Sequence, residues 1–262
     1  MGLEGIIGEE MKKVMIVSDI HAPFQDNKAV NIASIYASVY KPDIYVINGD
    51  LSDFYSISRF DKSPERRDNF QSELTKSQQV LDKLLENVPK KSRKVLVEGN
   101  HEYRLQQLVW NNPALYGVED LDLKNLLRLD KRGVELLRAE GDYWKGTKQY
   151  KIGDTVILHG DNRLDGASLS AKSGYSASNT MNKLNANVIM GHSHRGGIVY
   201  KRTPDKTIVG VESGCLCKAN GTADWNQGFV TFEIDDSGKS YNHRFHNIQK
   251  GRLVEDGNIY KG

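Results

Sequence analysis

Short apolar runs alternate with amphipathic stretches in the first part of the chain. The runs at 14–18, 44–48 and 95–97 are short and continuous, as expected of strands buried in a sheet. Between the first two runs, 27–40 carries apolar residues at helical spacing, and Lys41-Pro42-Asp43 ends it. A strand, a helix and a strand at this spacing predict a βαβ unit with parallel strands.

Two later stretches also have helical patterns. From 63 to about 88 the apolar residues form a helical stripe, and Ser63-Pro64-Glu65 offers an N-cap, a proline at the first helical position and an early acid. The stretch 102–140 is mainly helical in pattern, although Asn111-Asn112-Pro113 and Gly133 interrupt it. We interpret 102–140 as a helical insertion between strands of the core.

Short strands dominate the second part of the chain. The pattern predicts strands at 150–152, 155–158, 188–190, 198–201, 208–211, 229–234 and 241–246. A helix on the outside of the molecule is expected within 168–184, and 251–262 is expected to be a polar tail.

A side chain able to bind a metal follows five of the apolar runs. One such ending is easily explained as a polar turn, but five of them indicate a shared site, because the ends of parallel strands are where open α/β sheets place their ligands. The motifs are Asp19-Ile20-His21, Gly49-Asp50, Gly99-Asn100-His101-Glu102, His159-Gly160 and Gly191-His192-Ser193-His194.

The chemistry of these side chains suits a pair of divalent ions. Two ions about 3.5–4 Å apart need an anionic ligand that bridges them, and Asp50 suits that role because a carboxylate has two oxygens. The other candidate ligands form one set for each ion: Asp19, His21 and His194 for the first, and Asn100, His159 and His192 for the second. This histidine-rich mixture favours manganese, with iron, zinc, nickel or cobalt as alternatives, over calcium. Both halves of the chain supply ligands, so we expect a single domain over residues 1–262.

The five motifs, in this order, resemble those of the calcineurin-like metallophosphoesterases over about residues 14–215. The resemblance implies an α/β (α+β) fold, a two-sheet mixed β-sandwich flanked by helices, with a dinuclear metal site at the strand ends. It also implies the ligand assignment given above. It makes His101 the general acid that protonates the leaving oxygen, or a donor to the phosphate.

The residues after the second motif distinguish between branches of this superfamily. Its phosphoprotein phosphatases carry Asp-Arg-Gly after the Gly-Asp motif, whereas this chain has Gly49-Asp50-Leu51-Ser52-Asp53. The missing arginine makes the chain more similar to phosphodiesterases and nucleases, including the compact forms found in phages and prophages.

These observations imply a two-metal phosphodiesterase that hydrolyses nucleic acid or nucleotide diesters through a metal-bound hydroxide. A phosphomonoesterase acting on nucleotides or phosphoprotein is the alternative, and a non-catalytic, metal-stabilised binding module is a remote one. Four arginines are candidate substrate contacts: Arg104, Arg195, Arg66 and Arg67. Ion pairs with nearby carboxylates would also explain the first two, and a solvated helix end would explain the last two. Glu102 is expected to orient a ligand histidine, and Trp225 to pack in the core or to stack on a base.

The composition of the chain limits which binding partners it can have. The chain has 36 Lys and Arg against 34 Asp and Glu, a net charge of +2, so a nucleic acid must be bound by local positive charge. The sequence shows neither a run that could cross a bilayer nor a signal peptide, so we expect a cytoplasmic protein without a membrane partner or an obligate protein partner. Cys215 and Cys217 are expected to be reduced thiols, too few by themselves for a zinc site.

Overall fold

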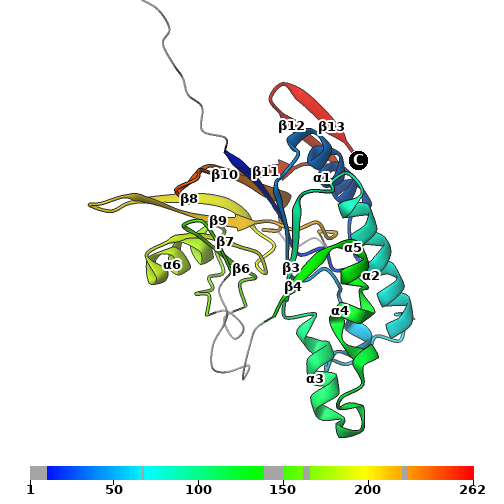
Figure 1. Cartoon of the computed structure of the whole chain (residues 1–262). Coiled ribbons are helices and arrows are strands. Elements are labelled where there is room, and N and C mark those ends of the chain that lie inside the picture. Colours follow the sequence, from blue (N-terminus) through cyan, green and yellow to red (C-terminus); the bar gives the residue numbers. More distant parts are fainter. Residues whose placement is uncertain (1–10, 67, 139–149, 162–165, 220–223) are drawn as a thin grey trace, which may run out of the picture.

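Two β-sheets pack face to face in a computed structural model that describes residues 11–66, 68–138, 150–161, 166–219 and 224–262 (Figure 1). In these residues the larger sheet has six strands in the order β11-β10-β1-β2-β3-β4. Their bounds are β1 (Lys12–Val17), β2 (Ile44–Asn48), β3 (Arg93–Val97), β4 (Val134–Leu137), β10 (Gln227–Ile234) and β11 (Ser240–Ile248). Strands β1 to β4 are parallel, and β10 and β11 are antiparallel to their neighbours.

The second sheet has five strands in the described residues, in the order β5-β6-β7-β9-β8. Their bounds are β5 (Tyr150–Ile152), β6 (Thr155–Leu158), β7 (Asn187–Met190), β8 (Gly196–Arg202) and β9 (Thr207–Ser213). Strands β6, β7 and β9 are parallel, whereas β5 and β8 pair antiparallel at the two edges. The predicted sandwich of two mixed sheets is therefore confirmed.

The hydrophobic core has three layers. Between the sheets, Val14, Ile16 and Val46 of the first pack with side chains of the second such as Ile189 and Val211. The outer face of the first sheet is covered by α1 (Asn27–Tyr40) and α2 (Phe70–Leu85), and the outer face of the second by α6 (Tyr175–Leu184). No helix in the described part of the chain is both long enough and apolar enough to span a membrane.

Three expectations from the sequence differ from the structure. The helix predicted from 63 begins at Phe70, because Asn69 and Ser72 form a reciprocal capping box while Ser63 lies in a turn. The stretch 102–140 is a set of short helices that ends in the strand β4, which pairs with β3. These helices are α3 (Tyr103–Asn111), η2 (Pro113–Leu115), η3 (Glu119–Leu121), α4 (Leu123–Leu126) and α5 (Leu129–Arg132).

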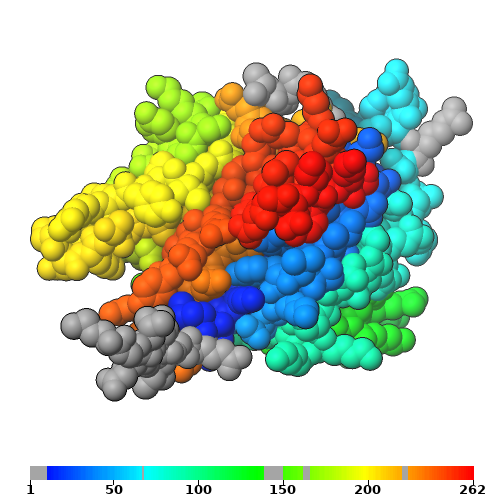
Figure 2. Space-filling model, turned by 90° about the horizontal axis from the view of Figure 1, so that it is seen from above, coloured from blue at the N-terminus to red at the C-terminus, as the bar shows by residue number. Residues whose placement is uncertain are grey.

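The predicted polar tail is the third difference. It is a hairpin of β12 (Arg252–Glu255) and β13 (Asn258–Lys261), shown in red beside β11 and the blue N-terminal part of the chain in Figure 2. Leu253 is buried and belongs to the same core cluster as the helix α1. Alternate polar residues in the segment hid this apolar contact from the sequence pattern.

Candidate metal centre

The predicted ligands lie at the ends of parallel strands from both sheets. Asp19 follows β1, Asp50 follows β2 and Asn100 follows β3 in the first sheet. His159 follows β6, and His192 precedes His194 after β7, in the second sheet. Because the sheets face each other, these ends meet at one edge of the sandwich.

The backbone at this edge is strained. Asp19, His21, Asp50, His192 and His194 all have left-handed conformations, with φ between 50° and 64°. Residues other than glycine rarely adopt such φ angles, and residues held in this conformation cluster at functional sites. The rest of the fold therefore imposes these conformations at the five positions.

Two motif glycines allow the loops to approach the ligand side chains. A Cβ atom at Gly99 would lie 2.3 Å from Oδ1 of Asp50, and one at Gly191 would lie 2.5 Å from Oδ2 of Asp19. Neither space can accept a methyl group. Each glycine thus permits a carboxylate to sit directly against a neighbouring loop.

The first group of ligand atoms lies around His194. Its Nε2 atom is 3.2 Å from Oδ1 of Asp19 and 3.0 Å from Nε2 of His21. Both nitrogens thus point toward a common space with the carboxylate of Asp19. Two imidazole nitrogens and a carboxylate oxygen are the donors that divalent transition metals and zinc accept.

The second group lies around Asn100. Its Oδ1 atom is 3.0 Å from Nε2 of His159 and 2.8 Å from Nδ1 of His192. Asp50 connects the two groups, because its Oδ2 atom is 3.2 Å from Nε2 of His159 and 3.7 Å from Nε2 of His21. Asp50 therefore lies within reach of both groups, and the donors present fit divalent metal ions.

The outer ring nitrogens of two histidines are held by hydrogen-bond acceptors. Nδ1 of His159 donates to the backbone oxygen of Asn48 at 3.0 Å, and Nδ1 of His21 donates to Oδ1 of Asp53 at 3.1 Å. In the neutral ring, each bond fixes the tautomer that leaves Nε2 free of hydrogen and directed into the site. Both rings are therefore oriented as metal ligands.

Electrostatics keep the central carboxylate ionised. Burial raises the pKa of Asp50, but the charges of His159 and His101 outweigh it, so this pKa lies well below its usual range. Burial lowers the pKa of His159, but Asp50 outweighs this effect and raises it. In the buried centre, the negative charge of the carboxylates and the positive charge of the imidazoles thus stabilise each other.

His101 lies beside the two groups. Its Nδ1 atom donates to the backbone oxygen of Asp53 at 2.8 Å, and its Nε2 atom is 3.0 Å from Nη2 of Arg104 and 3.9 Å from Oδ2 of Asp50. Burial lowers the pKa of His101, but the nearby carboxylates of Asp50 and Asp53 outweigh this effect and raise the pKa. In this arrangement Nε2 accepts from Arg104, so it can take up a proton beside the predicted bridging ligand only after that contact is broken.

Asp53 was not singled out as a site residue from the sequence. Its carboxylate contacts both His21 and His101, and its Oδ2 atom lies 3.5 Å from Nη2 of Arg66. The signal in the sequence was its position three residues after Asp50 in a turn. That signal was weak, because an acidic residue in a polar loop is common.

Glu102 does not orient a histidine, in contrast to the sequence-based interpretation. Its buried carboxylate accepts hydrogen bonds from the backbone nitrogens of Gly99, Asp50 and Ser52 at 2.9–3.0 Å. It therefore joins the loops after β2 and β3. Burial, and then the charge of Asp50, raise the pKa of Glu102 to about 7.

A cavity of about 550 Å³ opens over the candidate metal ligands. Arg66 lies at this cavity, with its guanidinium 4.1 Å from the ring centre of Phe24 and 3.5 Å from that of Tyr55. Trp225 also lines the cavity, with its ring centre 4.1 Å from that of His194, so it is a half-buried wall residue rather than a core residue.

The other candidate arginines are placed differently. Arg104 donates to the backbone oxygen of Asp53 as well as contacting His101. Arg195 is not among the residues that line the cavity, and its Nη1 atom donates to the backbone oxygen of Ser170 at 3.2 Å. Arg67 lies outside the described residues.

Known proteins resemble this chain in sequence and in fold. The "Gene 54 protein" of Mycobacterium phage L5 is 29% identical over 271 residues, covering 95% of this chain and 99% of that protein. The protein of the same name from Mycobacterium phage D29 is 28% identical with the same coverage. Among solved structures, a metallophosphoesterase from Sphaerobacter thermophilus has a TM-score of 0.47 and 15% identity, covering 92% of this chain and 89% of that one.

The family comparison agrees with the geometry of the site. The profile described as "Calcineurin-like phosphoesterase" matches residues 12–206, a range that contains every predicted metal ligand. The chain belongs to the calcineurin-like phosphoesterase family, whose reaction is the metal-dependent hydrolysis of phosphoesters.

Proposed function

We propose that this protein is a two-metal phosphodiesterase that cleaves nucleic acid or nucleotide diesters. The observation that carries the proposal is the position of Asp50 between two groups of donors, with one oxygen within 3.7 Å of a nitrogen from each group. A site for one ion would need no such carboxylate. Paired divalent ions, when bound there, supply a nucleophile and neutralise charge that develops on the phosphoryl oxygens.

The side chains around the ions divide the remaining tasks. Asp19, His21 and His194 would hold one ion, and Asn100, His159 and His192 the other. Asp53 fixes the ring of His21 through its Nδ1 atom. Glu102 fixes the loop that carries Asp50, so that the carboxylate need not be reoriented during the reaction.

His101 is the proposed general acid. Its Nδ1 hydrogen is committed to the backbone oxygen of Asp53, so the proton given to the leaving oxygen is the one on Nε2. We infer that Arg104 moves from its contact with Nε2 to a phosphate oxygen when substrate enters. Its Nη1 atom remains anchored on Asp53 during this change.

The aromatic and cationic side chains at the cavity rim suit a substrate that carries bases. Arg66 between two aromatic rings offers a positive charge held away from the ions, and Trp225 and Lys218 line the same cavity. Bases stack on aromatic side chains, and phosphates bind nearby cations. A diester also carries one negative charge fewer than a monoester, which suits a site with few cationic residues.

The test is hydrolysis of bis-p-nitrophenyl phosphate and p-nitrophenyl phosphate by chelated and by manganese-loaded protein. We expect no turnover after chelation, recovery with manganese, and faster hydrolysis of the diester. Full diesterase activity in protein shown by elemental analysis to be metal-free would contradict the proposal. Faster hydrolysis of the monoester would favour a phosphomonoesterase.

A further inference from the structure

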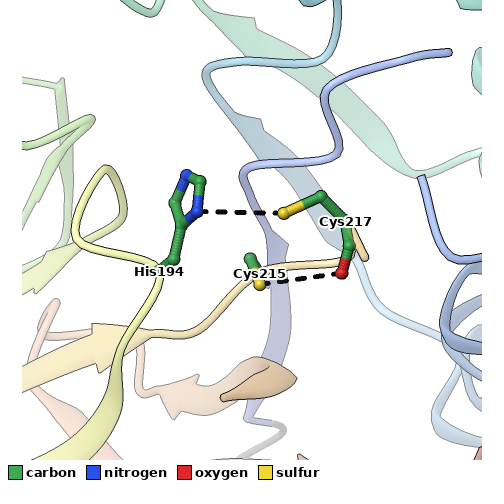
Figure 3. A group of neighbouring side chains, drawn as sticks. All are labelled: His194, Cys215 and Cys217. Atoms are coloured by element: carbon green, nitrogen blue, oxygen red, sulfur yellow. Dashed lines mark hydrogen bonds between the residues drawn. The ribbon is translucent and has the colours of Figure 1, made fainter. Parts of the chain in front are cut away.

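Two buried thiols lie behind the first group of metal ligands. Cys215 and Cys217, which follow β9, are free cysteines with 0% and 3% exposed surface. Both lie near the ring of His194 (Figure 3). Cys217 approaches its Nδ1 atom, whereas Asp19 lies beside its Nε2 atom. The side chain of His194 therefore separates two sets of donor atoms.

The distances in this cluster suit a small ion. Nδ1 of His194 lies 3.8 Å from Sγ of Cys217, and one donor atom each from His194, Cys215 and Cys217 lie within 4.8 Å of one another. Zinc bonds of about 2.0–2.1 Å to nitrogen and about 2.3 Å to sulfur put tetrahedral ligands roughly 3.6 Å apart. The observed nitrogen–sulfur distance is close to that edge, so small side-chain movements complete the geometry.

The chemistry of the cluster differs from that of the neighbouring groups. Its donors are two sulfurs and a nitrogen, whereas the groups around Asp50 consist of carboxylate and amide oxygens and imidazole nitrogens. Thiolates select zinc and other soft ions, while oxygen-rich sites accept manganese. Two cysteines and a histidine, with a fourth position open, form a known type of zinc site.

An ion can reach the cluster from the cavity. Cys217 and His194 are both among the residues that line it, and the cavity leaves room for a solvent molecule as the fourth ligand. Cys215 lies deeper and is fully buried. The cluster is thus accessible on one side and enclosed on the other.

We propose that Cys215, Cys217 and His194 form a Cys2His binding site for zinc or a similar soft ion, distinct from the two proposed catalytic ions. With both ions bound, His194 would be an imidazolate that has released its ring proton to solvent, with Nδ1 bound by the soft ion and Nε2 by the catalytic group. A soft ion at this site therefore acts on the catalytic centre through one shared ring. The proposal goes beyond the diesterase function and does not depend on it.

Cadmium is the probe for the test, because its bonds to thiolates give a charge-transfer band in the ultraviolet. Chelated protein is titrated with cadmium, and the bound ions are counted by equilibrium dialysis. We expect the wild type to develop the band and to bind one ion more than the double variant Cys215→Ser, Cys217→Ser, which should lack the band. The variant Asp50→Asn, altered only in the neighbouring groups, should retain the band.

The opposite outcomes would overturn the proposal. Wild-type protein without the band, or a double variant that binds as many ions as the wild type, would show that the thiols bind no metal. If the double variant does not fold by circular dichroism, cadmium-113 NMR of the wild type decides instead. A resonance of a thiolate-bound ion is expected, and resonances from nitrogen and oxygen coordination alone would contradict the site.

Discussion

Asp53 links the proposed general acid to a proposed metal ligand at the scale of single residues. Burial raises its pKa, but hydrogen bonds from His101 and His21 outweigh this and bring the pKa well below its usual range. The carboxylate is therefore ionised throughout the working pH range, accepts the hydrogen bond from His21 and lies 3.2 Å from Nδ1 of His101. One side chain thus orients two rings with different roles.

Replacing Asp53 with Asn should weaken metal binding without removing a ligand. The amide is neutral and a poorer acceptor, so Nδ1 of His21 loses its charged partner, and such partners typically account for roughly 10–100-fold in metal affinity. The measurement is isothermal titration with manganese, with Asp82→Asn on the surface as the matched control. Unchanged affinity in Asp53→Asn would show that His21 needs no support from this carboxylate.

Asp50 and His101 should be separable by experiment. Asp50→Asn removes the charged link between the donor groups, so both metal occupancy and turnover should fall. His101→Ala should keep its metals while turnover falls by about 10²- to 10⁴-fold, the usual contribution of a general acid. Elemental analysis and diester kinetics of both variants provide the check, and loss of metal from His101→Ala would place His101 among the ligands instead.

The sequence predicted the residues that gather at this edge but not the ones that support them. The ligand candidates were visible because each follows an apolar run, which places it at a strand end. The roles of Asp53 and Glu102 depend on contacts between loops, and no local pattern records such contacts. For the same reason the sequence left open whether Trp225 packs in the core or lies at the site, because its place in the cavity wall depends on the position of His194.

The segment between β2 and α2 is the element that shapes the cavity rim. Arg66 lies here, held by Phe24 and Tyr55. The helix predicted to start at Ser63 begins only at Phe70, where a better capping box is available. The segment before it is thereby left to extend toward the site, which is why its arginine reaches the cavity.

Arg66→Ala should affect long substrates more than short ones. Removing a phosphate-binding charge should lower turnover of single-stranded DNA by about tenfold and flatten its salt dependence, because one fewer counterion is released on binding. Bis-p-nitrophenyl phosphate should lose much less. The exposed Arg252 of β12, changed to Ala, serves as the control; equal losses on both substrates in Arg66→Ala would instead indicate a disturbed site.

Elements were predictable where local and tertiary preferences agree. Helix α1 has the predicted bounds because Asp26 caps its start and Lys41 ends it in a left-handed conformation. Strand β4 was missed because its four residues follow Gly133 within a helical pattern, and only pairing with β3 makes them a strand. The hairpin of β12 and β13 likewise depends on packing against the rest of the molecule.

The stability of the whole molecule should depend on pH through His243. Its ring stacks on Phe232 with centres 5.1 Å apart, and Nε2 is buried with no hydrogen-bond partner among the described residues. Burial lowers the pKa of His243 to about 4. The unfolded chain binds the proton near the ordinary value of about 6.5, so stability is fully present above that pH and is lost as the pH falls toward 4.

Replacing His243 with Phe should remove this part of the pH dependence. The difference in unfolding free energy between pH 7.5 and pH 4 should be about 2–3 kcal/mol smaller in the variant, since the depressed pKa accounts for that amount. Urea unfolding of both proteins across this pH range is the measurement. Parallel curves for wild type and variant would show that the ring titrates normally in the folded protein.

The ligand residues belong to two different sheets, three strand ends from one and two from the other. Ions bound between them would link the two sheets of the sandwich. Metal binding would then stabilise the packing of the two sheets, and tighter packing of the sheets would in turn raise metal affinity. Replacing a side chain buried between the sheets, such as that of Ile189, with a smaller one should lower metal affinity, although it touches no ligand. Metal affinity would therefore report the stability of the packing between the two sheets of this protein.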